Sequence, residues 1–329
     1  MKRISLTSLV FVAVAGLLAS AAWSPAAAWE PKEQGECIAP ANPGGGWDSI
    51  CRTAASSLQK TGLMKTTMYV TNMPGGSGAV AIANVITKRQ GDPNLLVACS
   101  NSLTFTMALK RSPHTWSDVI PLAQLYTEHG GFFVKQDSKY KNLGDLVNAL
   151  KADPKSVTFA GGSAPGSLDH IKAALFAKTI GVDPTKVVYV PFQGGGEALT
   201  SLLGGHTEVA PLDLSEVSAQ LEAGKLRCLG LLSEKRSAKF KDIPTAAEQG
   251  VKISFPVWRG VYMAPSVPAD AVKYWSESLQ KMAASPEYLA ELDKLGAEPM
   301  YMSPEEFTKF VKGEQIRFQE LLTELGFLK

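Results

Sequence analysis

The stretch CIAPANPGGGWDSICRTAASSLQK, residues 37–60, decides the fold because it joins a short apolar segment to an amphipathic helix through three glycines. Glycine lacks a Cβ, so another group can approach the backbone closely at this bend. No lysine follows the glycines, which excludes a phosphate-binding loop of the nucleotide-hydrolase type. The nearest side chains are those of Trp47 and Asp48, and we expect Asp48 to cap the helix.

The same pattern, a strand followed by glycines and a helix, recurs three times along the chain. It reads PGGSGAVAIANVITK at 74–88, GGSAPGSLDHIKAAL at 161–175 and GGGEALTSLL at 194–203. The first turn of a helix has N–H groups without intrahelical partners and carries partial positive charge, so each turn is a candidate anion site. Close packing of helix on sheet is the alternative for each, and it suffices to explain the turn at 74–88. In α/β folds these turns gather at the carboxyl ends of the strands.

The first 28 residues have the pattern of a secretory signal peptide. A basic start with Lys2 and Arg3 precedes a mostly apolar run over 4–22 and the small residues AAA at 26–28. A retained membrane anchor is the alternative, but the run is short and interrupted by Ser and Thr. We expect cleavage near Ala28 and export to the periplasm.

Composition narrows the class of protein. The chain is 45% hydrophobic and 19% charged, with a net charge of +2 and no clustered basic stripe, which argues against nucleic acid and membrane-surface partners. Four cysteines could pair in three ways in an oxidising compartment. Cys37 and Cys51 flank the first glycine turn, and we favour that disulfide; Cys99 and Cys228 are expected to be buried thiols.

Strand-like and helical segments alternate almost throughout, which favours an α/β fold with mainly parallel sheets and helices on both faces. The length suits two lobes, with 29–128 plus 258–329 in the first and 129–257 in the second, and with crossovers near 126–132 and 255–262. The segment from about 268 to 329 is expected to be nearly all helical. The expected strands are 35–41, 67–73, 95–100, 132–136, 157–162, 187–192, 208–213 and 226–232.

Catalytic signatures are incomplete. The segments around Ser163 and Ser77 lack the final glycine of a nucleophile elbow, and the approximate dinucleotide fingerprint at 76–81 lacks its acidic partner. The four histidines lack metal-ligand spacing. We therefore expect no enzyme, no cofactor and no metal. His170, three residues after Ser167, either lines a cleft or caps its helix locally.

One dipeptide adds a charged candidate. Trp258 and Arg259 fall at the second crossover, and so at the expected cleft floor. Arg forms planar bidentate contacts with carboxylates, which suits an anionic ligand. The alternative is an Arg paired with an acidic residue beside a core Trp.

The ordered set PGGGWD, NMPGGSG, GGSAPGS, VPFQGGGEAL, AGKLRCLGLLSEKR and WRGVYMAP resembles the periplasmic receptors of tripartite tricarboxylate transporters, the Bug-type receptors. The resemblance covers essentially the whole mature chain. It implies a two-lobed periplasmic binding protein fold of type II kind that closes around a small carboxylate. It also implies a grip by main-chain N–H groups of the loops 44–48 and 162–167, and delivery to a permease of one large and one small subunit. The Ala-Pro pair at 164–165 departs from the commonest family pattern.

The sequence thus predicts a monomeric solute receptor for a small organic di- or tricarboxylate. Alternatives are a receptor for an aromatic carboxylate, a receptor that feeds a signalling system, and a secreted hydrolase that uses Ser163. The expected ligand-binding residues are Gly44, Gly45, Gly46, Trp47, Asp48, Asn101, Ser102, Gly162, Ser163, Gly166, Ser167, His170, Gly194, Asp213, Trp258 and Arg259.

Overall fold

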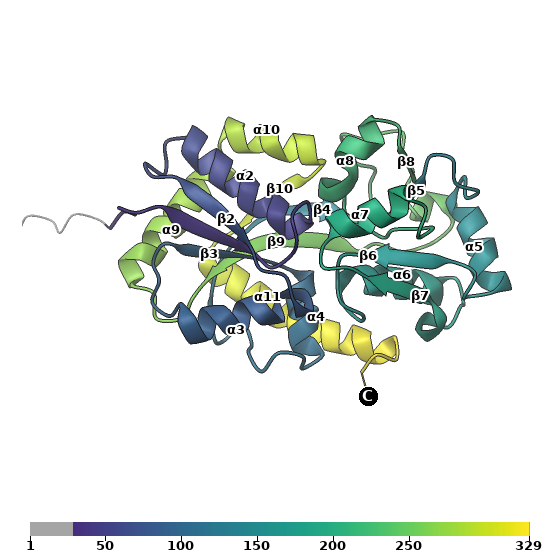
Figure 1. Ribbon diagram of the computed structural model, residues 1–329, viewed down its shortest axis with the longest axis horizontal. Coiled ribbons are helices and arrows are strands. Elements are labelled where there is room, and N and C mark those ends of the chain that lie inside the picture. The colour runs from purple at the N-terminus through teal and green to yellow at the C-terminus, as the bar shows by residue number, and fades with distance from the viewer. Residues whose placement is uncertain (1–28, 329) are drawn as a thin grey trace, which may run out of the picture. The chain divides into compact units, whose positions relative to one another are not determined.

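A computed structural model describes residues 29–328 of the chain (Figure 1). The expected signal peptide and its cleavage site lie outside these residues. Everything from Pro31 onward forms one compact unit, and the boundaries of the two lobes stay a prediction. Within the described residues, no helix combines the length and apolarity needed to cross a membrane.

A six-stranded mixed sheet organises the first and last parts of the chain. Its strand order is β10-β4-β9-β3-β1-β2. The neighbours of β1 are parallel to it, whereas β9 runs antiparallel to both β3 and β4, and β10 antiparallel to β4. The strands are β1 (Gly35–Ala39), β2 (Met68–Asn72), β3 (Leu95–Ser100), β4 (Ile120–His129), β9 (Pro256–Met263) and β10 (Glu298–Met302).

The middle of the chain forms two further pairs of strands. β5 (Gly131–Lys135) pairs antiparallel with β8 (Leu226–Leu231), and β6 (Thr158–Gly161) pairs parallel with β7 (Val188–Pro191). Residues 209–210 join the two pairs, because Val209 bridges to Phe159 and Ala210 to Phe133. The strand expected over 208–213 is therefore reduced to these isolated bridges.

Helices cover both faces of the six-stranded sheet: α2 and α10 lie on one side in Figure 1, and α3 and α11 on the other. The C-terminal helix α11 packs against α4 and β4. The helices are α2 (Gly46–Lys60), α3 (Ala79–Lys88), α4 (Asn101–Ala108), α5 (Leu143–Ala152), α6 (Leu168–Thr179), α7 (Gly195–Leu203), α8 (Leu214–Glu222), α9 (Ala269–Ala283), α10 (Pro286–Leu295) and α11 (Pro304–Glu324).

The expected strands need correction. The last segment is mainly helical as expected, but the edge strand β10 interrupts it. The strand list also omitted β4 and β9, which pair with each other along most of their length and run through the expected crossovers. Most of the ten residues of β4 are buried, including the polar residues Gln124 and Glu128. These polar residues interrupt the apolar run that is typical of a buried strand, so the sequence pattern did not indicate a strand here.

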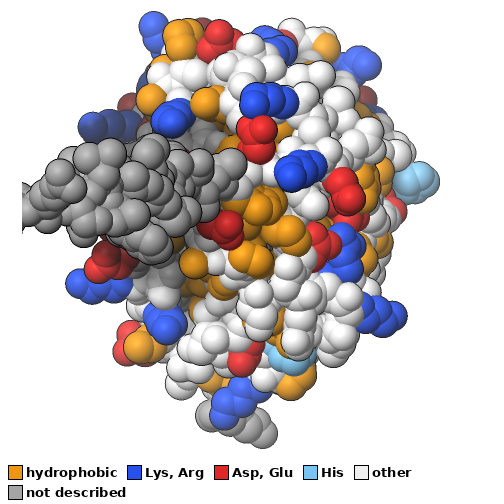
Figure 2. All heavy atoms as spheres, turned by 90° about the vertical axis from the view of Figure 1, so that its left-hand side faces the viewer, with side chains coloured by type: hydrophobic (Ala, Val, Ile, Leu, Met, Phe, Trp, Pro, Cys, Tyr) orange, Lys and Arg blue, Asp and Glu red, His pale blue; other side chains and the backbone are white. Residues whose placement is uncertain are grey.

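The expected disulfide is confirmed. Cys37 in β1 is bonded to Cys51 in α2 across 14 positions of sequence, and both half-cystines are fully buried. Cys99 and Cys228 are free and buried. The cross-link ties the middle of β1 to the second turn of α2, so it joins the two elements on either side of the first glycine turn. On the face that Figure 2 shows, basic and acidic side chains are interspersed rather than gathered by sign.

Candidate functional site

The four glycine turns converge on one cleft. A cavity of about 30 Å³ is lined by residues of the first, third and fourth turns, including Gly46, Gly162 and Gly195. A neighbouring chamber of about 200 Å³ adds the second turn through Gly75, Gly76 and Ser77. Trp47 and Gly162 line both spaces. The turn at 74–88, for which packing alone was a sufficient explanation, therefore faces the cleft.

The first turn is held from within by Asp48. The Gly44 N–H donates to Asp48 Oδ2 (3.0 Å), and Arg52 Nε (2.8 Å) and Asn72 Nδ2 (3.0 Å) also donate to this carboxylate. Burial opposes its ionisation, but the hydrogen bonds from Arg52, Gly44 and Asn72 outweigh burial and lower the pKa of Asp48. The expected helix-capping role is wrong, because the N-cap is Gly45 and has no side-chain cap. Asp48 instead shapes the turn, behind the cavity.

At the start of α2, side chains of the protein itself lie against the backbone of Gly46. The Gly46 N–H donates to Glu216 Oε1 (3.0 Å). A Cβ at Gly46 would lie 2.1 Å from Arg259 Nη2, so only glycine fits beneath that guanidinium. Two first-turn amides belong to residues that line the cavity and have no intrahelical acceptor: that of Trp47 in α2 and that of Gly195 in α7. These amides are the donors that the cleft can offer to an anion.

The loop 162–167 is tied down by the side chains of its own helix and of the facing turn. Gly162 N–H donates to Asp169 Oδ2 (2.9 Å), and Asp169 N–H donates to Ser163 Oγ (2.9 Å). Ala164 N–H donates across the cleft to Ser77 Oγ (2.8 Å), and Ser167 Oγ donates to the Ser102 carbonyl (3.3 Å). The main-chain donors of this loop that the resemblance assigned to a ligand are thus largely engaged with protein groups.

His170 supports this loop from behind. Its Nδ1 accepts from the Gly166 N–H (2.8 Å), and its ring stacks on Tyr189 with centroids 4.6 Å apart. Burial, with a smaller contribution from Arg111, lowers its pKa to about 4, so the imidazole is neutral near pH 7. Of the two roles considered for His170, the local one fits this structure.

Beneath the cavity lies a buried network of charges. Arg259 pairs through Nε with Glu128 (2.5 Å) and through Nη2 with Asp213 (2.8 Å). Lys172 Nζ pairs with Asp213 (2.5 Å) and Asp169 (3.0 Å), and also donates to the Pro211 carbonyl (2.9 Å). All five side chains are almost completely buried. Burial opposes the charge of Lys172 and Arg259, but these carboxylates outweigh burial and raise the pKa of both.

Arg259 is expected to hold a second ligand carboxylate, and two of its nitrogens are already engaged by protein carboxylates. Nε pairs with Glu128 and Nη2 with Asp213, whereas Nη1 has no carboxylate partner among the described residues. The alternative, an arginine paired with acidic residues, therefore describes part of its guanidinium. Arg259 still lines the cavity, so its charge acts on whatever binds there. Its sequence neighbour Trp258 points elsewhere, because successive side chains of a strand lie on opposite faces. Trp258 packs with Trp116 and Phe307 and lines a different groove.

The remaining predicted residues divide by position. Asn101 is structural: its Oδ1 accepts from the Trp258 N–H (3.0 Å) and ties α4 to β9. Gly44, Asp48, Gly166, Ser167 and His170 support the turns without lining either space. The predicted residues that do line the cavity or the chamber are Gly45, Gly46, Trp47, Ser102, Gly162, Ser163, Gly194, Asp213 and Arg259.

Sequence reasoning missed Glu128, Asp169, Lys172 and Glu216. The spacing of Asp213 and Glu216, an acid three positions after an N-cap, is a capping-box signal, and the Asp213 N–H does donate to Glu216 Oε2 (3.0 Å). Lys172 falls on the buried side of α6, where a lysine signals a buried partner. The described residues contain no group of His, Cys, Asp and Glu that could hold a metal ion.

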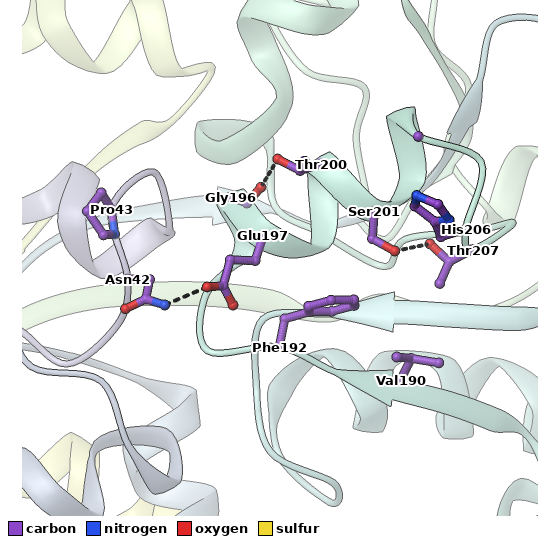
Figure 3. A pocket seen from close by; sticks show the side chains of 11 residues that line it. Asn42, Pro43, Val190, Phe192, Gly196, Glu197, Thr200, Ser201, His206 and Thr207 are labelled. Carbon is purple, nitrogen blue, oxygen red and sulfur yellow. Dashed lines mark hydrogen bonds between the residues drawn. The ribbon is translucent and has the colours of Figure 1, made fainter.

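A wide groove borders the cleft beside the first and fourth glycine turns. About 990 Å³ in volume, it lies between the residues before α2 and the helix α7 (Figure 3). Asn42 Nδ2 donates to Glu197 Oε1 (2.6 Å) across it, and the Asn42 N–H donates to the Gln193 carbonyl (2.8 Å). These bonds clasp the first glycine turn to the fourth.

Comparison with known proteins agrees with this architecture. The family model described as the tripartite tricarboxylate transporter family receptor matches residues 50–327. The protein BugT of Bordetella pertussis is 28% identical over 331 residues, which cover 96% of this chain and 95% of BugT.

Solved structures show the same fold. That of the periplasmic binding protein BugD has a TM-score of 0.83 at 22% identity and covers 91% of this chain and 99% of its own. That of R. palustris Rpa4515 with adipate has a TM-score of 0.82 at 23% identity, with 90% and 98% covered. The family consists of transporter receptors rather than enzymes, which is the class expected from the sequence. The chain belongs to the tripartite tricarboxylate transporter receptor family.

Proposed function

We propose that this protein is an exported, periplasmic receptor that binds one small organic acid in the cleft between the glycine turns and delivers it to a two-subunit membrane permease. The observation that carries the proposal is the convergence of the four glycine turns on one cavity and one chamber, with the first-turn amides of α2 and α7 at the cavity. Such amides favour an anion through their hydrogen bonds and through the helix dipole.

The chamber limits the size of the ligand. Its volume of about 200 Å³ suits a small acid rather than a peptide or nucleotide. Rings line much of its wall: those of Pro40, Trp47, Pro165, Pro191 and Phe192. We propose that the ligand carboxylate lies at the helix starts while its carbon skeleton occupies the chamber. An aromatic acid is the second candidate, because these rings offer flat apolar surface.

The energetics are sufficient for a transport receptor. A hydrogen bond to a charged group contributes roughly 1.5–3 kcal/mol. A micromolar dissociation constant corresponds to about 8 kcal/mol after the costs of association. Three or four amide or indole donors on one carboxylate, together with burial of the carbon skeleton, would supply this. The adipate complex of Rpa4515 supports the class of ligand, since that protein shares the fold.

Calorimetric titration with citrate, malate, adipate and benzoate tests the proposal. We expect at least one acid to bind with one-to-one stoichiometry and to raise the unfolding temperature. The test variant is Gly195→Ala, because its Cβ would lie 2.0 Å from Glu216 Oε1 and so disturb the cavity. This variant should bind the same acid more weakly than the wild type. Failure of all four acids to bind, or equal affinity in the variant, would contradict the proposed site.

A further inference from the structure

One carboxyl group in the buried network lacks a cation. The two cations Arg259 and Lys172 pair with Glu128, Asp213 and Asp169. Glu216, the fourth acid, makes no ion pair within the described part of the chain. It accepts only from two main-chain N–H groups, those of Gly46 and Asp213 (each 3.0 Å).

Glu216 stands where an anion would be bound. It lines the 30 Å³ cavity, and its Oε1 reaches the first residue of α2 through the Gly46 N–H. The same oxygen would lie 2.0 Å from a Cβ at Gly195, the first residue of α7. The carboxyl group of Glu216 therefore lies between the starts of two helices, at the position proposed for the ligand carboxylate or directly beside it.

The groups around Glu216 favour its neutral form. Burial from bulk solvent is the largest effect, followed by the negative charges of Asp213 on its own helix and Asp169 on α6; Arg259 on β9 and Lys172 on α6 oppose them. Together, burial and these charges raise the pKa of Glu216 to about 8. Glu128 on β4 adds a further acid to the network through its bond to Arg259. Near neutral pH the group is mostly a carboxylic acid, with a proton to donate.

We propose that Glu216 is the specificity-determining group of this cleft: as a neutral acid it donates a hydrogen bond to the bound carboxylate, and as an ion it excludes it. This inference rests on the proposed function. It adds the requirement that the Glu216 carboxyl group be protonated when the acid binds. Two like-charged carboxylates in one small cavity repel, whereas an acid and a carboxylate share a proton in a charge-assisted hydrogen bond.

The cavity beside Glu216 is lined by groups of both signs. The starts of α2, α7 and α8 all place their positive ends at this cavity, which is also lined by Arg259. The carboxylates of Asp213 and Asp169 line the same cavity and offset part of this positive charge. A proton on Glu216 neutralises the fourth acid without adding a bulky cation to the cavity.

The test compares wild type with Glu216→Gln, which keeps the size of the side chain and an N–H donor at every pH. Citrate, malate, adipate and benzoate are titrated by calorimetry between about pH 6.5 and about pH 9.5. The wild-type dissociation constant should rise about tenfold per pH unit above about pH 8, while that of the variant stays flat. The control Glu320→Gln, which removes an exposed carboxylate of α11, should follow the wild type.

A second measurement needs no ligand. The infrared carbonyl band of a protonated carboxylic acid should be present in the wild type near pH 7, should fade by about pH 9.5, and should be weaker in Glu216→Gln near pH 7. Identical spectra for the two proteins would overturn the inference. So would acid binding with the same pH slope in both, and in that case the proposed function stands. If no acid binds either protein at any pH, both proposals fail.

Discussion

Two buried tryptophans, Trp47 and Trp258, form a natural pair for comparison at the level of single residues. Each has an indole Nε1 that is buried and has no hydrogen-bond partner among the described residues. Trp47 lines the cavity and the chamber, whereas Trp258 lines a groove on another face. A buried donor without a partner is costly, so a ligand that accepts from Trp47 would gain binding energy.

We therefore predict that Trp47→Phe weakens binding of the tightest acid by roughly 1.5 kcal/mol or more, about tenfold, because a hydrogen bond to a charged acceptor is lost. Trp258→Phe makes the same chemical change outside the cleft and should leave affinity within about twofold. Calorimetry on both variants measures this. A loss that is equal in the two variants would remove Trp47 from the ligand contacts.

The pH dependence of stability follows from Glu216. Its pKa rises from an ordinary value of 4.5 to about 8 in the folded protein. Between these values the folded chain holds a proton that the unfolded chain has released, so this contribution to stability is full below about pH 4.5 and is lost as pH rises through about 8. Relative to Glu216→Gln, the wild-type free energy of unfolding should fall by up to about 1.4 kcal/mol per pH unit across that window. Urea titrations at several pH values measure it; parallel curves would contradict the assignment.

How far the sequence predicts these residues depends on the range of the interaction. Trp47 and Ser163 were found because they adjoin glycine turns, which are local signals. Arg259 was found too, but its partners are distant in sequence: Glu128 in β4 is 131 positions away, and Asp213 at the start of α8 is 46 positions away. A sequence pattern shows that an arginine is present; which carboxylates surround it depends on the tertiary fold.

At the level of elements, the strand-to-helix turns were the most predictable feature. All four occur where the glycines indicated, and the strands that lead into them lie within one or two residues of the expected bounds. β4, β9 and β10 were missed as strands for a physical reason. They pair antiparallel with one another, and their mixed polar and apolar residues do not show the β-branched runs typical of parallel strands.

The disulfide belongs to the same level, since it fixes β1 to α2. Replacing both half-cystines in Cys37→Ala/Cys51→Ala should lower the free energy of unfolding by about 3 kcal/mol, the value for a closed loop of about this length. It should also weaken acid binding, because the two elements on either side of the turn 44–48 lose their cross-link. Thermal unfolding with and without reductant measures the effect. Reductant should destabilise the wild type and Cys99→Ala/Cys228→Ala but not the first variant; sensitivity in all three would contradict this account.

For the molecule as a whole, the cleft is closed by a few direct hydrogen bonds between segments far apart in sequence. Asn42 reaches Gln193 and Glu197, and Ser77 accepts from Ala164. The residues so joined border the cavity and the chamber, so opening these bonds would widen the access of an acid to both spaces. The strands β4 and β9 run through both expected crossovers, so they are the expected hinge. An opening motion about them would expose the helix starts. A ligand that contacts both sides of the cleft would then bind the closed form more tightly and increase its population.

This reasoning gives the last prediction. The double variant Asn42→Ala/Ser77→Ala deletes the two side-chain hydrogen bonds, those with Glu197 and Ala164, and keeps the main-chain bond from Asn42 to Gln193. The two lost bonds are worth about 2 kcal/mol in total, so the ratio of closed to open forms should fall by up to roughly 30-fold. Small-angle scattering should show a larger radius of gyration for this variant without ligand, and a wild-type value once a binding acid saturates it. Thr87→Ala, whose hydroxyl bonds only within α3, should behave as the wild type. An unchanged radius and unchanged affinity in the double variant would mean that closure is set by the buried ion pairs across Asp213 and Arg259, and not by the clasp at the rim.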